Sequence, residues 1–138
     1  MAGVLVFTEI RDGKVRKASR EALSIGRKLA EGTGGELAAF ATDAGVAEEV
    51  GRYGAKRLFV AEMGPYSTDS WTAALSAAVT QAQPSVLLFG STSNGRDLAP
   101  RVAARHGVGV ASDVDQLEWA GDRLRARRPV YSSKVFAT

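Results

Sequence analysis

Hydrophobic residues in this chain gather in short runs, which alternate with segments of helical spacing. Four of these runs predict β-strands, at Val4–Phe7, Glu36–Phe40, Arg57–Val60 and Ser85–Phe89. Alternating strands and helices are typical of β/α units that build a parallel sheet. The third and fourth runs are apolar at consecutive positions, as expected for parallel strands with helices on both faces. The pattern therefore predicts a three-layer α/β/α sandwich with a mainly parallel sheet.

The segments between these runs predict four helices. In the first helix Ala22, Leu23, Gly26, Leu29 and Ala30 share one face. Ser19 is a suitable N-cap for it, and Gly32 or Gly34 a suitable end. The other three helices are expected at Ala44–Tyr53, at about Thr68–Gln83, and after Asn94 as far as His106.

Beyond His106 the pattern changes to extra C-terminal strands, separated by turns. They are expected at about Ser112–Trp119, Arg123–Arg128 and Ser133–Ala137, with a hairpin turn at Ala120-Gly121-Asp122. Four arginines alternate with Leu124 and Ala126, which predicts a basic face and a packing face; the arginines are Arg123, Arg125, Arg127 and Arg128. The basic face suits either solvent or a docking partner. The chain stops in a strand-like segment, so a cut between domains is expected there.

Composition narrows the possible functions. At 138 residues, one domain is expected over the whole chain, residues 1–138. The 18 basic and 15 acidic residues give a net charge of +3, which offers little reason to propose nucleic acid as a partner. Because cysteine is absent and His106 is the single histidine, neither thiolate chemistry nor a transition-metal site is expected. Neither a targeting segment nor an apolar run of about 20 residues is present, so a cytoplasmic protein is expected.

The segment Gly90–Gly95 resembles a phosphate-binding loop. It has the Gly-x4-Gly frame, but Arg96 and Asp97 occupy the positions where such a loop needs lysine and a hydroxyl. Asp97, expected in the first turn of the following helix, would satisfy the helix dipole and repel phosphate. The structural interpretation is that Asn94 or Ser93 caps this helix. The functional one is that Ser91, Thr92 and Arg96 contact a partner or the edge of a cofactor.

Other candidate sites are weaker. The segment Gly107–Ser112 imitates a dinucleotide fingerprint, but it follows a helix instead of a strand. Asp113 and Asp115 would share a strand face without a third ligand. His106 is expected to end its helix near the negative pole of the dipole. Arg101 and Arg105 lie on one helical face, solvated or facing an acidic partner, and Trp71 and Trp119 suit a core or an interface. No nucleophile with its base, carboxylate dyad or metal shell can be assembled.

The chain is similar to the N-terminal domain of the α subunit of electron transfer flavoprotein. The similarity covers all 138 residues in order, and four segments carry it: residues 4–15, Gly90–Ala104, Ser112–Val114 and Arg128–Lys134. The resemblance implies a Rossmann-like sandwich of the adenine-nucleotide-hydrolase-like kind.

This resemblance also implies a function. The family is a heterodimeric electron carrier in electron transport and fatty acid β-oxidation, taking electrons from dehydrogenases and passing them to a quinone oxidoreductase. Its flavin adenine dinucleotide (FAD) is held mostly by a C-terminal α-subunit domain, so this chain alone is expected to bind none and to be colourless. An adenine nucleotide is expected in the β subunit but not here. The implied role is a scaffold that packs against the β subunit, with no nucleic acid or membrane partner.

No residue is expected to be catalytic, cofactor-binding or metal-binding. The interface candidates are Ser91, Thr92, Arg96, Arg101, Arg128 and Tyr131. The alternative is a stand-alone nucleotide-binding module of universal-stress type. Against it, the fourth strand is not followed by Gly-x2-Gly and, nine residues later, Gly-Ser/Thr. An adenylating or amidotransferring enzyme would need a Ser-Gly-Gly-x-Asp-Ser loop at Thr8–Gly13, which is missing.

Overall fold

Four parallel strands form one side of the main sheet, from its edge inwards. The computed structural model describes residues 3–114, 116–121, 123–127 and 133–137. In it the parallel strands are β1 (Val4–Phe7), β4 (Leu37–Ala41), β5 (Arg57–Val60) and β6 (Val86–Gly90), in the order β5-β4-β1-β6. They are the strands that the apolar runs predicted, with small shifts at their ends.

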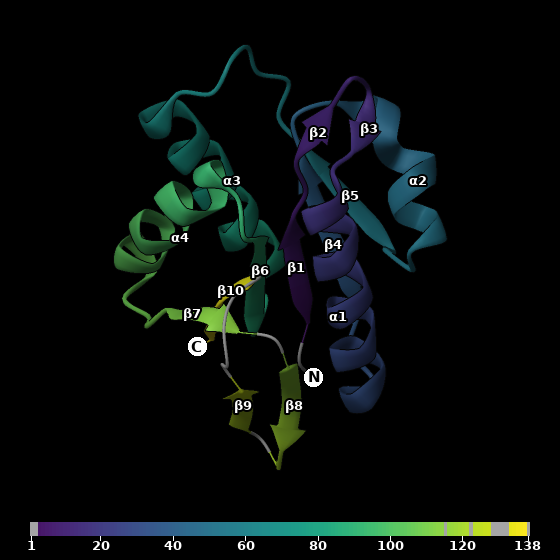
Figure 1. Cartoon of the computed structure of the whole chain (residues 1–138), viewed down its shortest axis with the longest axis vertical. Coiled ribbons are helices and arrows are strands. Elements are labelled where there is room, and N and C mark those ends of the chain that lie inside the picture. Colours follow the sequence, from purple (N-terminus) through teal and green to yellow (C-terminus); the bar gives the residue numbers. More distant parts are fainter. Residues whose placement is uncertain (1–2, 115, 122, 128–132, 138) are drawn as a thin grey trace.

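Helices cover both faces of this sheet, and β1 shows why. Val4 and Val6 point into a core shared with α1 (Lys17–Thr33) and α2 (Ala47–Arg52). Leu5 and Phe7 point into a second core, shared with α3 (Thr68–Ala82) and α4 (Ser93–His106). Figure 1 shows the two helix pairs on opposite sides of the strands. The predicted three-layer α/β/α sandwich is therefore confirmed.

Strand β5 contacts the cores on both faces, through Leu58 and Phe59, but it is less buried than predicted. It lies at the edge of the sheet, beside β4 only. Its four residues are exposed or half-buried, and Val60 is 40% exposed. Strand β6, in contrast, is buried throughout, as predicted. A run of consecutive apolar residues identified a parallel strand in both cases, but not its place in the sheet.

Several predicted helix ends needed correction. Helix α1 begins at Lys17, after Arg16, so the prediction that Ser19 caps it was wrong; Ser19 is buried in the first turn. Its predicted end at Gly34 is confirmed by a left-handed backbone, with φ of 71°. The predicted helix Ala44–Tyr53 is a 3-10 turn, η1 (Ala44–Val46), followed by α2.

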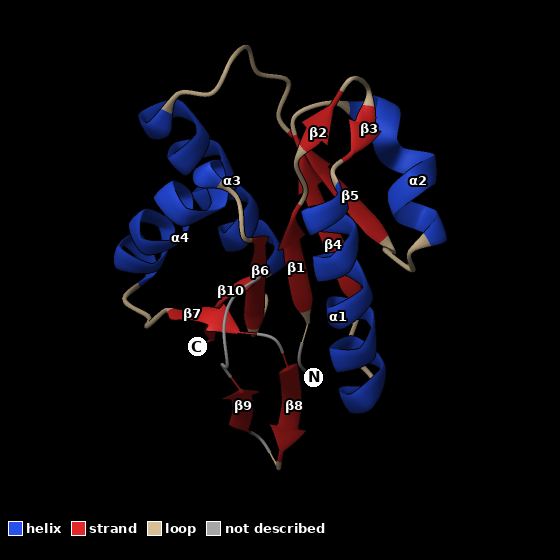
Figure 2. Ribbon diagram, in the orientation of Figure 1, coloured by secondary structure: helices blue, strands red, loops and turns tan. Residues whose placement is uncertain are grey.

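Further strands extend the sheet beyond β6. Strand β10 (Ser133–Ala137) pairs antiparallel with β6, and β7 (Ala111–Val114) pairs with β10. Strands β8 (Gln116–Ala120) and β9 (Arg123–Arg127) form a separate antiparallel hairpin below the sheet in Figure 2. The single strand predicted at Ser112–Trp119 is thus two described strands, β7 and β8, which belong to different sheets.

The pattern missed one small hairpin, β2 (Ile10–Arg11) and β3 (Lys14–Val15), which stands over the start of α1. Its turn is Asp12-Gly13, and both residues have positive φ, 53° and 76°. An Asp-Gly pair is the preferred sequence of such turns, so this dipeptide was the available signal.

Both tryptophans anchor the core. Trp71 packs edge-on against Phe7 and Tyr66, with ring centroids 6.2 and 5.0 Å away. Trp119 belongs to β8, and its indole Nε1 donates a hydrogen bond of 2.9 Å to the carbonyl of Leu29 in α1. The hairpin is thereby fastened to α1, and half-buried Leu124 packs beside it, as predicted. Ala126, expected to pack, is exposed.

Candidate functional site

The candidate site lies where β1 and β6 end side by side. After β1 the chain enters α1 on one face of the sheet, and after β6 it enters α4 on the other. In open α/β sheets, such a change of direction leaves a crevice at the carboxyl ends of the strands, and ligands usually bind there. Thr8 and Glu9 follow β1, and Ser91 and Thr92 follow β6.

The carboxylate of Glu9 fills this position. Glu9 is only 5% exposed, and it accepts a hydrogen bond from the Thr92 hydroxyl. The Asn94 amide and the Arg16 guanidinium donate to its other oxygen over 3.4 and 3.3 Å. Two segments that are far apart in sequence, residues 9–16 and 92–94, therefore meet on one buried carboxylate, which satisfies the rule that a buried charge is paired and hydrogen-bonded.

Backbone contacts complete the Glu9 cluster, which we define as Glu9, Arg16, Ser19, Thr92 and Asn94. The amide of Glu9 donates to the buried Ser19 hydroxyl over 2.9 Å. The amide of Arg16 donates to the carbonyl of Glu9, also over 2.9 Å. The start of α1 is thus held to the end of β1. Sequence reasoning did not single out Glu9 from its chemistry, since nothing local indicates a partner 83 residues away.

The Gly-x4-Gly frame has a packing role. Thr92 caps α4 by accepting a hydrogen bond from the amide of Gly95 over 3.0 Å, so the prediction of Asn94 or Ser93 as the cap was wrong. A Cβ on Gly95 would overlap the carbonyl oxygen of Gly90. A Cβ on Gly90 would lie 2.8 Å from the Cβ of Ala18 in α1. Both glycines therefore permit close approach of the backbone. The amide of Gly95 already donates to Thr92, so it is not available to a phosphate.

A second carboxylate, Asp97, fastens the other side of α4. It accepts hydrogen bonds from the hydroxyls of Tyr66, over 2.5 Å, and Thr68, over 2.7 Å, and it pairs with Arg101 over 3.3 Å. Asp97 was expected in the first turn of the helix, satisfying the dipole. The first turn of α4 contains no acidic residue, so this expectation was wrong. Asp97 instead ties the start of α3, and Tyr66 just before it, to α4.

The hydrogen bonds of this pair shift both pKa values. Donation from Tyr66, and then from Thr68, lowers the pKa of the Asp97 carboxyl below its ordinary 3.8. Burial, helped by the hydrogen bond to Asp97, raises the pKa of Tyr66 to about 12. The phenol is therefore held as a donor, and the carboxylate as an acceptor, across the neutral range.

The predicted interface residues differ in their exposure. Thr92 is buried in the Glu9 cluster, whereas half-buried Ser91 accepts a hydrogen bond of 3.0 Å from exposed Arg96. Arg101 is exposed and paired with Asp97. Arg128 and Tyr131 lie outside the described residues.

The weaker candidate sites either have structural roles or lie outside the described residues. Gly107 ends α4 in a left-handed conformation, with φ of 66°, so the segment that imitates a dinucleotide fingerprint is the end of a helix. His106 is the last residue of α4, as predicted. Asp115 and the side chain of Asp113 fall outside the described residues. Among the described residues, no group of three metal-ligating side chains is present.

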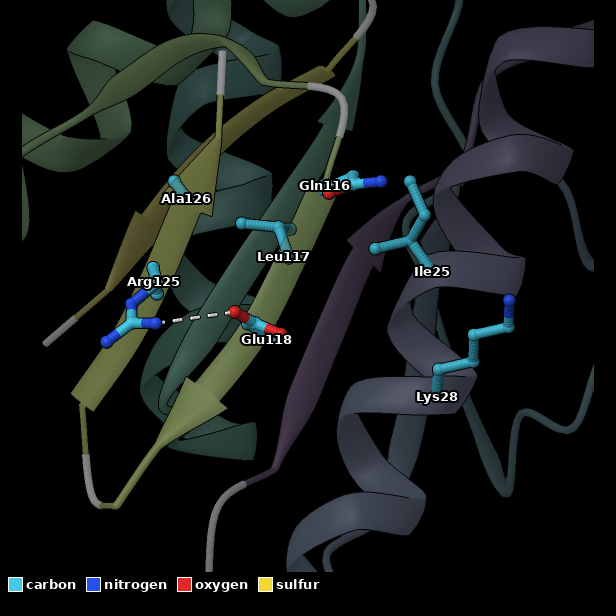
Figure 3. Close-up of a pocket in the computed structure, with 7 residues that line it drawn as sticks. All are labelled: Ile25, Lys28, Gln116, Leu117, Glu118, Arg125 and Ala126. Atoms are coloured by element: carbon cyan, nitrogen blue, oxygen red, sulfur yellow. Dashed lines mark ion pairs between the residues drawn. The ribbon is translucent and has the colours of Figure 1, made fainter.

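A groove of about 570 Å³ separates α1 from the β8–β9 hairpin (Figure 3). Ile25 and Lys28 line one wall, and residues of β8 and β9 line the other. Arg125 and Glu118 form an ion pair across the two strands, 3.6 Å long. The arginine side of the hairpin is therefore partly neutralised by its own neighbour. No described helix has the length and apolar character that crossing a bilayer requires.

Comparison with known proteins decides the family. The sequence pattern of the electron transfer flavoprotein domain matches residues 4–138. The chain belongs to the electron transfer flavoprotein family. This match confirms the resemblance inferred from the sequence segments.

Individual relatives bear names that agree with this family. The chain is 35% identical to electron transfer flavoprotein subunit alpha of Syntrophomonas wolfei, over 99% of this chain and 44% of the relative. It is 33% identical to the protein of the same name from Bacillus subtilis, over 96% and 42%. It is 38% identical to acryloyl-CoA reductase electron transfer subunit beta of Anaerotignum propionicum, over 83% and 33%. The chain thus spans less than half the length of these relatives.

Proposed function

We propose that this chain is the N-terminal scaffold domain of the α subunit of a heterodimeric electron transfer flavoprotein. The observation that carries the proposal is the family match over residues 4–138, together with two relatives named as this subunit. In the complete complex, electrons would pass from dehydrogenases to a quinone oxidoreductase or another acceptor. We place this carrier in the cytoplasm and assign no catalytic residue to the domain.

The site at the carboxyl ends of β1 and β6 does not fit the family's flavin. A dinucleotide in this crevice would need backbone donors at the start of α4 and room for its pyrophosphate. The amide of Gly95 is taken by Thr92, and the Glu9 carboxylate fills the crevice with negative charge. We therefore propose that FAD belongs to the complete complex and is held away from this crevice.

The described residues instead support a structural role. Glu9 contacts the starts of both α1 and α4. Helices on opposite faces of the sheet are thereby joined at its carboxyl edge. A braced edge offers a rigid surface against which another subunit can pack, because little order is lost on binding.

Co-expression with the β subunit encoded in the same genome tests this proposal. The expected result is an equimolar complex in size-exclusion chromatography, while the chain purified alone shows no visible flavin absorption band. A chain that stays separate from the β subunit would contradict the scaffold role. Flavin bound to the chain alone would contradict the proposed place of the cofactor.

A further inference from the structure

A cleft of about 790 Å³ opens on the outer side of the Glu9 cluster. Its walls are the β2–β3 hairpin, the first turn of α1 and the turn after β6. Five basic side chains line it against two acidic ones, Asp12 and Glu21; the basic residues are Arg11, Lys14, Arg16, Lys17 and Arg20. This excess of three positive charges equals the net charge of the whole chain, +3, so the rest of the chain has no net charge.

The two inner arginines are held in place. One nitrogen of Arg16 is paired with Glu9 over 3.3 Å, and one nitrogen of Arg20 donates to the carbonyl of Val15 over 2.7 Å. A guanidinium carries five N–H donors in a fixed plane, so each arginine keeps donors for a further acceptor. Because each side chain is already anchored, less rotamer freedom is lost when a carboxylate binds.

The outer cations are uncompensated. Arg11, Lys14 and Lys17 are exposed, and none has a carboxylate partner among the described residues. The first turn of α1 also contains no acidic residue of its own. The groove in Figure 3 differs, because its Arg125 is paired with Glu118.

We propose that this basic cleft docks an acidic segment of a protein partner. The cations come from two elements, hairpin and helix, and they lie on an exposed rim, which suits carboxylates spread along a peptide. A small-molecule site would instead enclose most of its ligand. The inference does not depend on the proposed electron-carrier function.

Binding of this kind is steered by charge and weakened by salt. Exposed pairs lose most of their attraction beyond the Debye length, about 8 Å at 0.15 M salt. We therefore expect micromolar or weaker affinity at low salt, falling steeply as salt is added.

The test uses the 138-residue chain with a fluorescently labelled poly-glutamate peptide, followed by anisotropy at low salt. The cleft variant is Lys14→Glu with Lys17→Glu, and the matched control is Lys28→Glu with Lys56→Glu. All four lysines are exposed, so both variants should fold and both carry the same change in net charge. We expect at least about a tenfold weaker affinity for the cleft variant, and less than about threefold for the control.

Three results would overturn the proposal: equal losses in both variants, equal binding of a poly-glutamine peptide, and inorganic pyrophosphate binding in place of the peptide. The first would indicate general charge attraction, and the last a small-anion site. Thermal unfolding checks that each variant is folded. If the cleft variant unfolds, Arg11→Gln replaces it, and unchanged affinity for the peptide would then count against the cleft.

Discussion

Two carboxylates hold α4, and they differ mainly in burial. Glu9 is 5% exposed and joins the ends of β1 and β6 to the starts of α1 and α4. The side chain of Asp97 is 34% exposed and joins α4 to the start of α3 and to Tyr66 just before it. A buried carboxylate that loses its partners leaves unpaired groups out of reach of water, whereas a half-exposed one can be rehydrated. The inner carboxylate is therefore expected to contribute more to stability.

The largest loss of stability is expected at Gly95, because the turn between β6 and α4 leaves no room for a Cβ there. Gly95→Ala places a methyl group on the carbonyl oxygen of Gly90, so the turn must open. We expect a loss of roughly 3 kcal/mol or more in the free energy of unfolding, measured with urea. Gly51→Ala is the control and should be neutral or slightly stabilising, because Gly51 lies in the last turn of α2 with open space around an added Cβ. Equal effects of the two changes would contradict the close approach.

Breaking the inner carboxylate comes next. Glu9→Ala leaves the Thr92 hydroxyl, the Asn94 amide and the Arg16 guanidinium without their acceptor, so we expect a loss of roughly 2 to 4 kcal/mol. Glu9→Gln keeps the shape but turns one acceptor into a donor facing other donors, and should cost about half as much. Chemical denaturation measures both. A loss below that of Asp97→Asn would reverse the comparison.

A smaller effect is expected at the outer carboxylate. Asp97→Asn weakens the hydrogen bonds from Tyr66 and Thr68 and removes the ion pair with Arg101. The lowered pKa of Asp97 means that its contribution is present at neutral pH and is lost as pH falls below about 3.8 through the folded-state value. The melting temperature of the wild type should therefore exceed that of Asp97→Asn at pH 7, and the gap should narrow in acid. A gap that stays constant would show that Asp97 acts through packing alone.

The smallest effect is expected at Tyr66. Its pKa is raised to about 12, so its contribution is complete below the ordinary value of 10.0 and is lost as pH rises towards about 12. Spectroscopic titration of tyrosinate should find one tyrosine that ionises late in the wild type. In Tyr66→Phe this late step should vanish. A late step that persists in the variant would assign the shift to another tyrosine.

Much of the fold could be predicted from the sequence, because the residues of a strand themselves show whether it is apolar enough to be buried in a sheet. Runs such as Val86–Phe89 are apolar at every position, and a central strand needs that pattern. Ser133–Ala137 was placed at its observed ends. The same pattern overestimated the burial of Arg57–Val60, because the place of a strand at the edge of a sheet is decided by the rest of the chain.

The site was harder to predict because its contacts span the chain. Ser93, Asn94 and Thr92 can all cap a helix, and the choice follows from where β6 releases the chain beside α1. Glu9 follows an apolar strand like many exposed residues, and its partners become visible only when β1 and β6 are side by side. The resemblance to the family was drawn from whole segments, and the family match likewise spans residues 4–138.

Calorimetric titration of AMP into the purified chain tests most directly whether Glu9 fills the crevice at the ends of β1 and β6. The account predicts no saturable heat, with any Kd weaker than about 1 mM. Saturable binding in the micromolar range, lost in a Thr92→Val variant that still folds, would contradict it and would favour a nucleotide-binding module.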